Sequence, residues 1–106
     1  MNFALSTNWN ARRHTDGAAL VDEIAALGFD ALELGYATTP EQVPGIKSRL
    51  DRMPVRSVHA FCPVPVSAPH GYPELQLLAS FDEDERALAA MLVRKTIEFA
   101  GSMGAA

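Results

Sequence analysis

The stretch LGFDALELGY, residues 27–36, decides the fold. It joins the end of an amphipathic helix to a short strand through a glycine, which suits the left-handed residue that ends many helices. Within the strand, Leu32 and Leu34 point to one face and Ala31 and Glu33 to the other. One face of this strand is therefore apolar and the other is small or polar.

The same unit, a strand followed by a helix, occurs three times along the chain. The patterns predict strands at residues 3–9, 30–36 and 55–62 and helices at residues 18–29, 39–53 and 80–104. This alternation favours an α/β fold with a parallel sheet and right-handed crossovers, in the order βαβαβα.

Start signals precede each predicted helix. Thr15 or Asp16 can cap the first helix, and Thr39 caps the second ahead of a proline and a glutamine. Ser80 and Glu83 have the spacing of a capping box for the third helix. The third helix is expected to bury an apolar stripe formed by Leu88, Met91, Leu92 and Phe99.

The two faces of the predicted strands differ along the whole sheet. The small or polar face consists of Ala4, Ser6 and Asn8, then Ala31, Glu33 and Gly35, then Ser57 and His59. A doubly wound sheet is covered on both sides and needs apolar residues on both faces. A barrel with a polar site at the carboxyl ends of its strands needs this asymmetry, so the pattern favours part of a (β/α) barrel.

Composition narrows the functional classes. The chain has 106 residues, enough for one domain, 48% of them apolar, and a formal net charge of −4. This acidic balance argues against nucleic-acid or membrane-surface partners, which need a cationic face. Cys62 is the only cysteine, so no internal disulfide can form, and a reducing cytoplasmic setting is expected. We see no signal peptide and no apolar run of transmembrane length.

Four segments in order resemble the xylose isomerase-like TIM-barrel superfamily, in its sugar phosphate isomerase/epimerase group. They are FALSTNW (3–9), LGFDALELGY (27–36), SVHAFCPVP (57–65), and LASFDEDERALA with TIEFAGSMGA (78–89 and 96–105). The resemblance covers nearly the whole chain and implies an eight-fold barrel, which needs about 250 residues. Residues 1–106 would then be the N-terminal three βα units of an incomplete barrel, and the isolated chain would be inactive.

The resemblance also implies the chemistry. Members of the group move a proton alpha to a carbonyl of a carbohydrate substrate, with a divalent metal such as Mn, Mg, Co or Zn. The metal ligands come from later strands, so they are expected mostly outside this chain. In the related DNA-repair endonuclease branch, a third-strand histidine binds metal, and His59 matches that position loosely.

Four residues are candidates for substrate binding. His59 and Glu33 would face the site, whereas the alternatives are a hydrogen-bonded core histidine and a structural ion pair. Asn8 and Trp9 end the first strand, and Trp9 could either stack on a sugar ring or fill the barrel mouth. No catalytic residue is assigned from the sequence.

Other positions carry weaker hypotheses. Residues 12–14, Arg-Arg-His, could clamp a phosphate, although a solvated loop is the simpler interpretation. Cys62 is interpreted as a small buried apolar residue, and His70 and Tyr72 as parts of a lid.

Two other functions stay open from the sequence. One is a metal-dependent phosphodiesterase of the endonuclease-like branch. The other is a non-catalytic α/β binding module that forms a homo-oligomer through its open sheet edges.

Overall fold

The computed structural model describes residues 2–63 and 78–105, and in them a three-stranded parallel sheet. The strands are β1 (Ala4–Ser6), β2 (Ala31–Leu34) and β3 (Val55–Val58), and they lie side by side in chain order. Ser6 pairs with Glu33 and Glu33 pairs with Ser57, with an irregularity in the β2–β3 register between Leu32 and Glu33. The α/β class and the βαβαβα order predicted from the sequence are confirmed.

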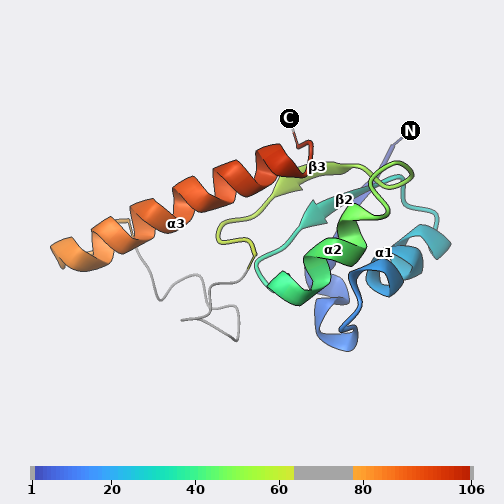
Figure 1. Cartoon of the computed structure of the whole chain (residues 1–106), viewed down its shortest axis with the longest axis horizontal. Coiled ribbons are helices and arrows are strands. Elements are labelled where there is room, and N and C mark those ends of the chain that lie inside the picture. The colour runs from blue at the N-terminus through green and yellow to red at the C-terminus, as the bar shows by residue number, and fades with distance from the viewer. Residues whose placement is uncertain (1, 64–77, 106) are drawn as a thin grey trace.

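One α-helix follows each strand along the chain: α1 (Gly17–Ala26), α2 (Val43–Lys47) and α3 (Glu83–Ser102) (Figure 1). Short 3-10 helices follow β1 at Thr7–Trp9 and Ala11–Arg13 and precede α2 at Pro40–Gln42. Asp16 caps α1 by accepting a hydrogen bond from the Ala18 amide at 2.9 Å. Gly28 has a φ of +92°, the left-handed conformation predicted for it.

The core lies between the sheet and the first two helices. Leu20, Val21 and Ile24 of α1 pack with Leu32 and Leu34 of β2, and all five are fully buried. Burying side chains of this size contributes roughly 1.5–3 kcal/mol each, so this layer is the main source of stability. It also fixes which face of the sheet is left for polar residues.

The helices α1 and α2 cross at two glycines. A Cβ on Gly17 would lie 1.8 Å from the carbonyl oxygen of Gln42, and one on Gly45 would lie 2.3 Å from the Ala18 amide nitrogen. Only glycine permits this backbone-to-backbone approach. Gln42 is itself buried, and its amide donates to the carbonyls of Ala11 and His14 at 2.7 and 2.8 Å. The crossing thus fixes the loop that follows β1.

Several element boundaries differ from the prediction. The first strand ends at Ser6, so Asn8 and Trp9 lie in a 3-10 turn and not in the strand. The second helix was expected to reach Met53 but ends at Lys47, and turns carry the chain on to β3. Pro44 lies in the first turn of α2, where proline is tolerated, and Gly45 lowers the helix propensity of the segment, which fits a helix of five residues.

The capping box predicted for α3 is wrong. Asp82 is the N-cap, and its carboxylate accepts hydrogen bonds from the amides of Asp84 and Glu85. Ser80 lies two residues earlier, where its hydroxyl accepts from the Asp82 amide and bonds the Glu85 carboxylate. Two good cap residues stand two positions apart, and the structure uses both.

The buried stripe predicted on α3 is also wrong in part. Leu88 and Met91 are 38% and 42% exposed, and Leu92 and Phe99 are only partly buried. The buried positions of the helix are instead Ala89 and Thr96, and Met103 follows at the same spacing. Thr96 is tied to the end of the β3 segment because its hydroxyl accepts the Cys62 amide at 3.2 Å.

None of the helices within residues 2–63 and 78–105 is long and apolar enough to cross a bilayer. The outer edges of β1 and β3 have no partner strand among these residues. Self-association through these edges therefore stays a prediction.

Candidate functional site

A row of polar side chains crosses the sheet on the face opposite α1 and α2. The register aligns Ser6, Glu33 and Ser57 across the three strands. The Ser57 hydroxyl donates to Glu33 Oε2 at 2.8 Å, and this pair is open to solvent. Glu33 is therefore held by a neutral donor, and none of the ion pairs found among residues 2–63 and 78–105 involves it.

His59 continues this face beyond β3. Its amide donates to the Leu34 carbonyl at 2.8 Å, so the pairing extends past the strand and places His59 opposite Gly35. Strand alternation then puts the His59 side chain on the same face as Glu33 and Ser57. The imidazole is exposed, as expected for a residue that faces a site and not a packed core.

The ring of His59 is oriented by two contacts. Its Nδ1 lies 2.6 Å from the Ala60 carbonyl oxygen, and because a carbonyl only accepts, Nδ1 carries the hydrogen. Tyr36 packs edge-on against the ring, with centroids 5.3 Å apart. In the neutral ring, Nε2 is then an acceptor, and no hydrogen bond to it is found in the part of the chain that the structure describes.

Asn8 lies over Gly35 on this face. A Cβ on Gly35 would fall 2.1 Å from Asn8 Oδ1, so the missing side chain leaves the space that the amide occupies. Asn8 Oδ1 accepts the Ala37 amide at 3.0 Å, which anchors the loop after β2. Asn8 thus has a structural role, and only its Nδ2 is available for the substrate contact predicted for it.

A buried chain of hydrogen bonds lies beneath the site. The Gly35 amide donates to Thr7 Oγ1 at 2.8 Å, and Thr7 and Thr38 hydroxyls lie 3.0 Å apart. A hydroxyl donates one hydrogen bond and can accept two, so either threonine can be the donor in this contact. Thr38 in turn hydrogen-bonds the Cys62 thiol. These contacts link the ends of all three strands, so the polar face has a rigid base.

Cys62 is the buried small residue that the sequence predicts. It is 2% exposed, and burial raises the pKa of its thiol to about 12, against a smaller lowering effect of the hydrogen bond with Thr38. A thiol with this pKa is not a nucleophile near neutral pH. Cys62 therefore belongs to the base of the site and not to its chemistry.

Trp9 and the basic loop form a separate cluster around Glu23. Arg13 lies over the Trp9 ring at 4.5 Å and pairs with Glu23 at 3.0 Å, while His14 Nε2 is 2.6 Å from the same carboxylate. Hydrogen bonds from Asn10, His14 and Arg13 lower the pKa of Glu23 to about 2. Arg13 and His14 are thus engaged internally, which weakens the phosphate-clamp hypothesis for this loop.

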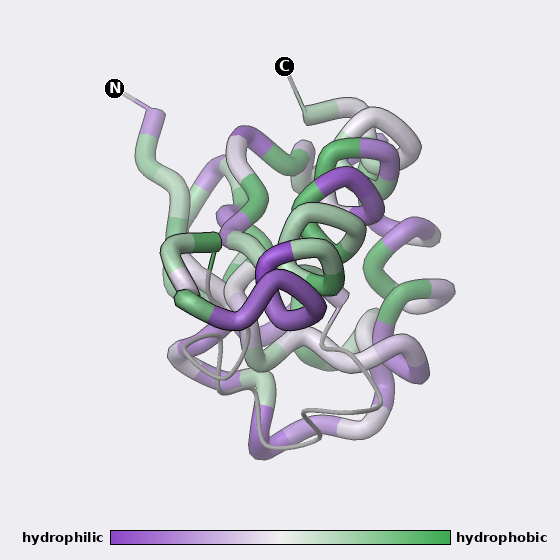
Figure 2. The backbone as a smooth tube through the Cα atoms, turned by 90° about the vertical axis from the view of Figure 1, so that its left-hand side faces the viewer, coloured by the Kyte–Doolittle hydropathy of each residue, from purple (hydrophilic) through white to green (hydrophobic). Residues whose placement is uncertain are grey.

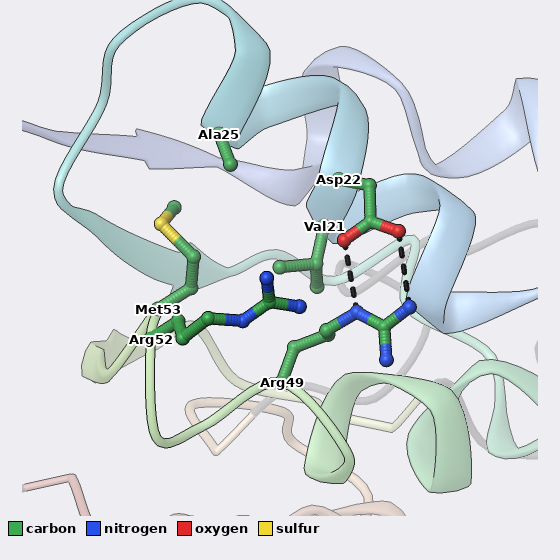
Figure 3. Close-up of a pocket in the computed structure, with 6 residues that line it drawn as sticks. All are labelled: Val21, Asp22, Ala25, Arg49, Arg52 and Met53. Carbon is green, nitrogen blue, oxygen red and sulfur yellow. Dashed lines mark hydrogen bonds and ion pairs between the residues drawn. The ribbon is translucent and has the colours of Figure 1, made fainter.

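A hollow of about 120 Å³ lies away from the polar face, between α1 and the segment that follows α2 (Figure 3). Arg49 donates two hydrogen bonds to Asp22 across its rim, at 2.9 and 3.1 Å, and Arg52 points into it. Because the carboxylate already neutralises Arg49, we assign no ligand to this hollow.

The described residues do not provide a metal centre. Within residues 2–63 and 78–105, no three His, Cys, Asp or Glu side chains lie close enough to hold an ion. On the polar face, Glu33 Oε2 accepts from Ser57 and His59 Nδ1 bonds a carbonyl, and these two side chains alone do not make a metal centre. The lid residues predicted at His70 and Tyr72 lie outside the described residues.

Sequence reasoning missed Thr7, Thr38 and Tyr36. The ring of Tyr36 reaches His59 because the chain turns at residue 36, after β2 ends, and a strand pattern does not predict that turn. The threonines have no motif, and only their burial at strand ends reveals their role.

Comparison with protein-family models, with curated proteins and with solved structures finds no match for this chain.

Proposed function

We propose that this chain provides the first three strands of a carbohydrate site in a sugar (phosphate) isomerase or epimerase with a (β/α) barrel fold. The observation that carries the proposal is the grouping of Asn8, Glu33, Ser57 and His59 on one face at the carboxyl ends of parallel strands. Active sites of (β/α) barrels lie at this end of the sheet. The strand order, which follows the chain order, is also the order of strands in such a barrel.

The four side chains suit a polyol. Glu33 accepts hydrogen bonds from hydroxyl groups, and Ser57 keeps its carboxylate oriented. Asn8 Nδ2 supplies a donor, since its Oδ1 is already engaged. A ligand rich in hydroxyl groups can satisfy both types of partner, whereas an apolar ligand would leave the carboxylate desolvated and unpaired.

His59 is the candidate base. With hydrogen on Nδ1, its Nε2 lone pair can take a proton from the carbon next to a carbonyl, and the carbonyl oxygen then carries the enediolate charge. Return of the proton to the neighbouring carbon, while the hydroxyl proton of the first carbon passes to the former carbonyl oxygen, gives isomerisation. Epimerisation needs a second acid that protonates the first carbon from its other face. The cycle leaves His59 unchanged and needs no oxidant.

Binding is tested on the 106-residue chain by amide NMR titration with a ketose, a ketose phosphate and an inositol. We expect millimolar binding with shifts at residues 8, 33–36 and 57–59. Glu33→Gln should weaken binding at least about fivefold, while Glu41→Gln, the same change at an exposed residue before α2, should not. Shifts that avoid the polar face would refute the proposed site.

Catalysis is tested by solvent deuterium incorporation into the same sugars. The pure 106-residue chain is expected to be inactive, and protein isolated from its source is expected to label the carbon next to the carbonyl, with added Mn²⁺ or Mg²⁺. Loss of labelling in a His59→Asn variant of the protein that labels the sugar, with sugar binding retained, would support the base role. Full labelling in that variant would contradict it.

A further inference from the structure

The helix α3 presents an exposed face with an ordered set of charges. Asp84, Leu88, Met91 and Lys95 are all exposed, the two apolar side chains at 38% and 42%. With 3.6 residues per turn, these four positions fall within about 60° around the helix. Along the helix axis the face runs acid, apolar, apolar, base.

This order of residues complements itself when a second copy of the helix lies antiparallel to the first. Its midpoint lies between residues 89 and 90, with Leu88 and Met91 next to it and Asp84 and Lys95 each about 8 Å away at 1.5 Å per residue. A two-fold axis through that midpoint, perpendicular to the helix, places each residue opposite its complement on an antiparallel copy. Asp84 then faces Lys95, and Leu88 faces Met91.

The charges on this face have no competing partner within the described chain. No ion pair to the carboxylate of Asp84 or to the ammonium of Lys95 is found among residues 2–63 and 78–105. The first turn of α3 is strongly acidic, with Glu83, Asp84 and Glu85. Figure 2 shows the end of this helix nearest the viewer as hydrophilic. A neighbour complementary to this face would offer a cation at one end, apolar contact in the middle and an anion at the other end.

We propose that this face of α3 binds the same face of a second copy of the chain, antiparallel and about a two-fold axis. Such an interface is isologous and closes after two copies. Two Asp84–Lys95 pairs would flank the Leu88–Met91 contacts and choose the orientation, because a parallel pair would bring like charges together. The proposal does not depend on the proposed carbohydrate site.

The interface is small, so the dimer should be weak. A contact along one helix of 20 residues falls below the roughly 1,200 Å² of a standard stable interface. The net charge of −4 on each copy also opposes association. We expect a dissociation constant of tens to hundreds of micromolar, and this places the test at high protein concentration.

The test is sedimentation equilibrium of the 106-residue chain between 10 and 500 µM. Lys95→Asp sets two acids opposite each other at both ends and should weaken association at least about tenfold. Adding Asp84→Lys to that variant restores both pairs with the signs exchanged and should return the dissociation constant to within about threefold. Lys47→Asp makes the same charge change on α2 and should have no effect.

Circular dichroism of each variant shows whether α3 stays helical, which separates lost association from lost folding. A chain that is monomeric at 500 µM would overturn the proposal. A dimer that ignores Lys95→Asp would do so as well, since it would show another surface, such as an open strand edge. Failure of the exchanged pair to restore association in a folded variant would refute this register.

Discussion

The glycines of the helices allow one substitution to be tested in two opposite settings. Gly17 opens α1 against the backbone that leads into α2, and Gly101 lies near the end of α3. A Cβ on Gly17 would stand 1.8 Å from the Gln42 carbonyl oxygen and 2.8 Å from the Ile46 nitrogen, whereas one on Gly101 would meet nothing within 4 Å. Both glycines become alanine in the test.

The magnitudes follow from those contacts. An ordinary contact begins at 3.4 Å, so Gly17→Ala must separate two backbones by about 1.6 Å or tilt α1. Overpacking of this kind costs about 1–3 kcal/mol, or more when backbone has to move, and the helix propensity of alanine returns at most about 1 kcal/mol. Because all three close atoms are backbone, we expect a cost of about 4 kcal/mol and hence a net loss of about 3 kcal/mol for Gly17→Ala. Gly101→Ala meets no obstacle and should gain about 0.5–1 kcal/mol.

The assay is urea unfolding followed by far-ultraviolet circular dichroism. With a urea dependence of about 1–3 kcal/mol per molar, the Gly17→Ala midpoint should fall by about 1–3 M and the Gly101→Ala midpoint should rise slightly. A Gly17→Ala variant within about 0.5 kcal/mol of the parent protein would refute the close crossing of α1 and α2. The same result would show that this crossing does not position the loop after β1.

Three further predictions concern buried or paired polar groups. Gln42→Met removes three hydrogen bonds, including the one to the Thr39 amide at 3.0 Å, and should cost about 2–4 kcal/mol in urea unfolding. The pKa of Glu23 is lowered from 4.5 to about 2, so its stabilising effect is complete above about pH 4.5 and is lost as pH falls towards 2. The urea midpoint of Glu23→Gln should therefore lie below that of the parent at pH 7 and converge with it near pH 2. Cys62, with a pKa of about 12, should react with a thiol reagent at pH 8 slowly when native and rapidly in urea; fast native labelling would contradict its burial.

The sequence predicts local features well because they depend on neighbours in the chain. The Asp16 cap, the left-handed Gly28 and the alternation in β2 each involve residues within a few positions of one another. The α/β class follows from their order. Predicting these features required no knowledge of long-range contacts, and the structure confirms them.

The errors arise where distant segments decide the outcome. The first strand stops at Ser6 because Thr7 and Asn8 turn towards the loop after β2, which supplies Gly35, Thr38 and Ala37 as partners. A strand pattern cannot show that competition. The α3 stripe failed for a similar reason: the helix has apolar residues over a wide arc, and only its neighbours select Ala89 and Thr96 for burial.

The candidate site shows both what the sequence predicts and what it misses. Glu33, Ser57 and His59 were predicted to share a face, and the described geometry places them on it. Asn8 was expected there as a strand residue and reaches the face from a turn instead. Tyr36 contacts His59, although strand alternation would set it on the other face with Leu34, because the chain turns after β2.

The position of Glu33 limits what can cover the polar face. Glu33 lies on the central strand, and both neighbouring strands place a serine in register with it. Successive right-handed crossovers in one direction leave the helices on one side, where the buried leucines of β2 already lie. An apolar layer on the other side would desolvate a carboxylate whose one hydrogen-bond donor from a side chain is Ser57 in the described chain, at a cost of several kcal/mol. Water or a polar molecule avoids that cost, and a ligand with several hydroxyl groups offers the donors that Glu33 lacks.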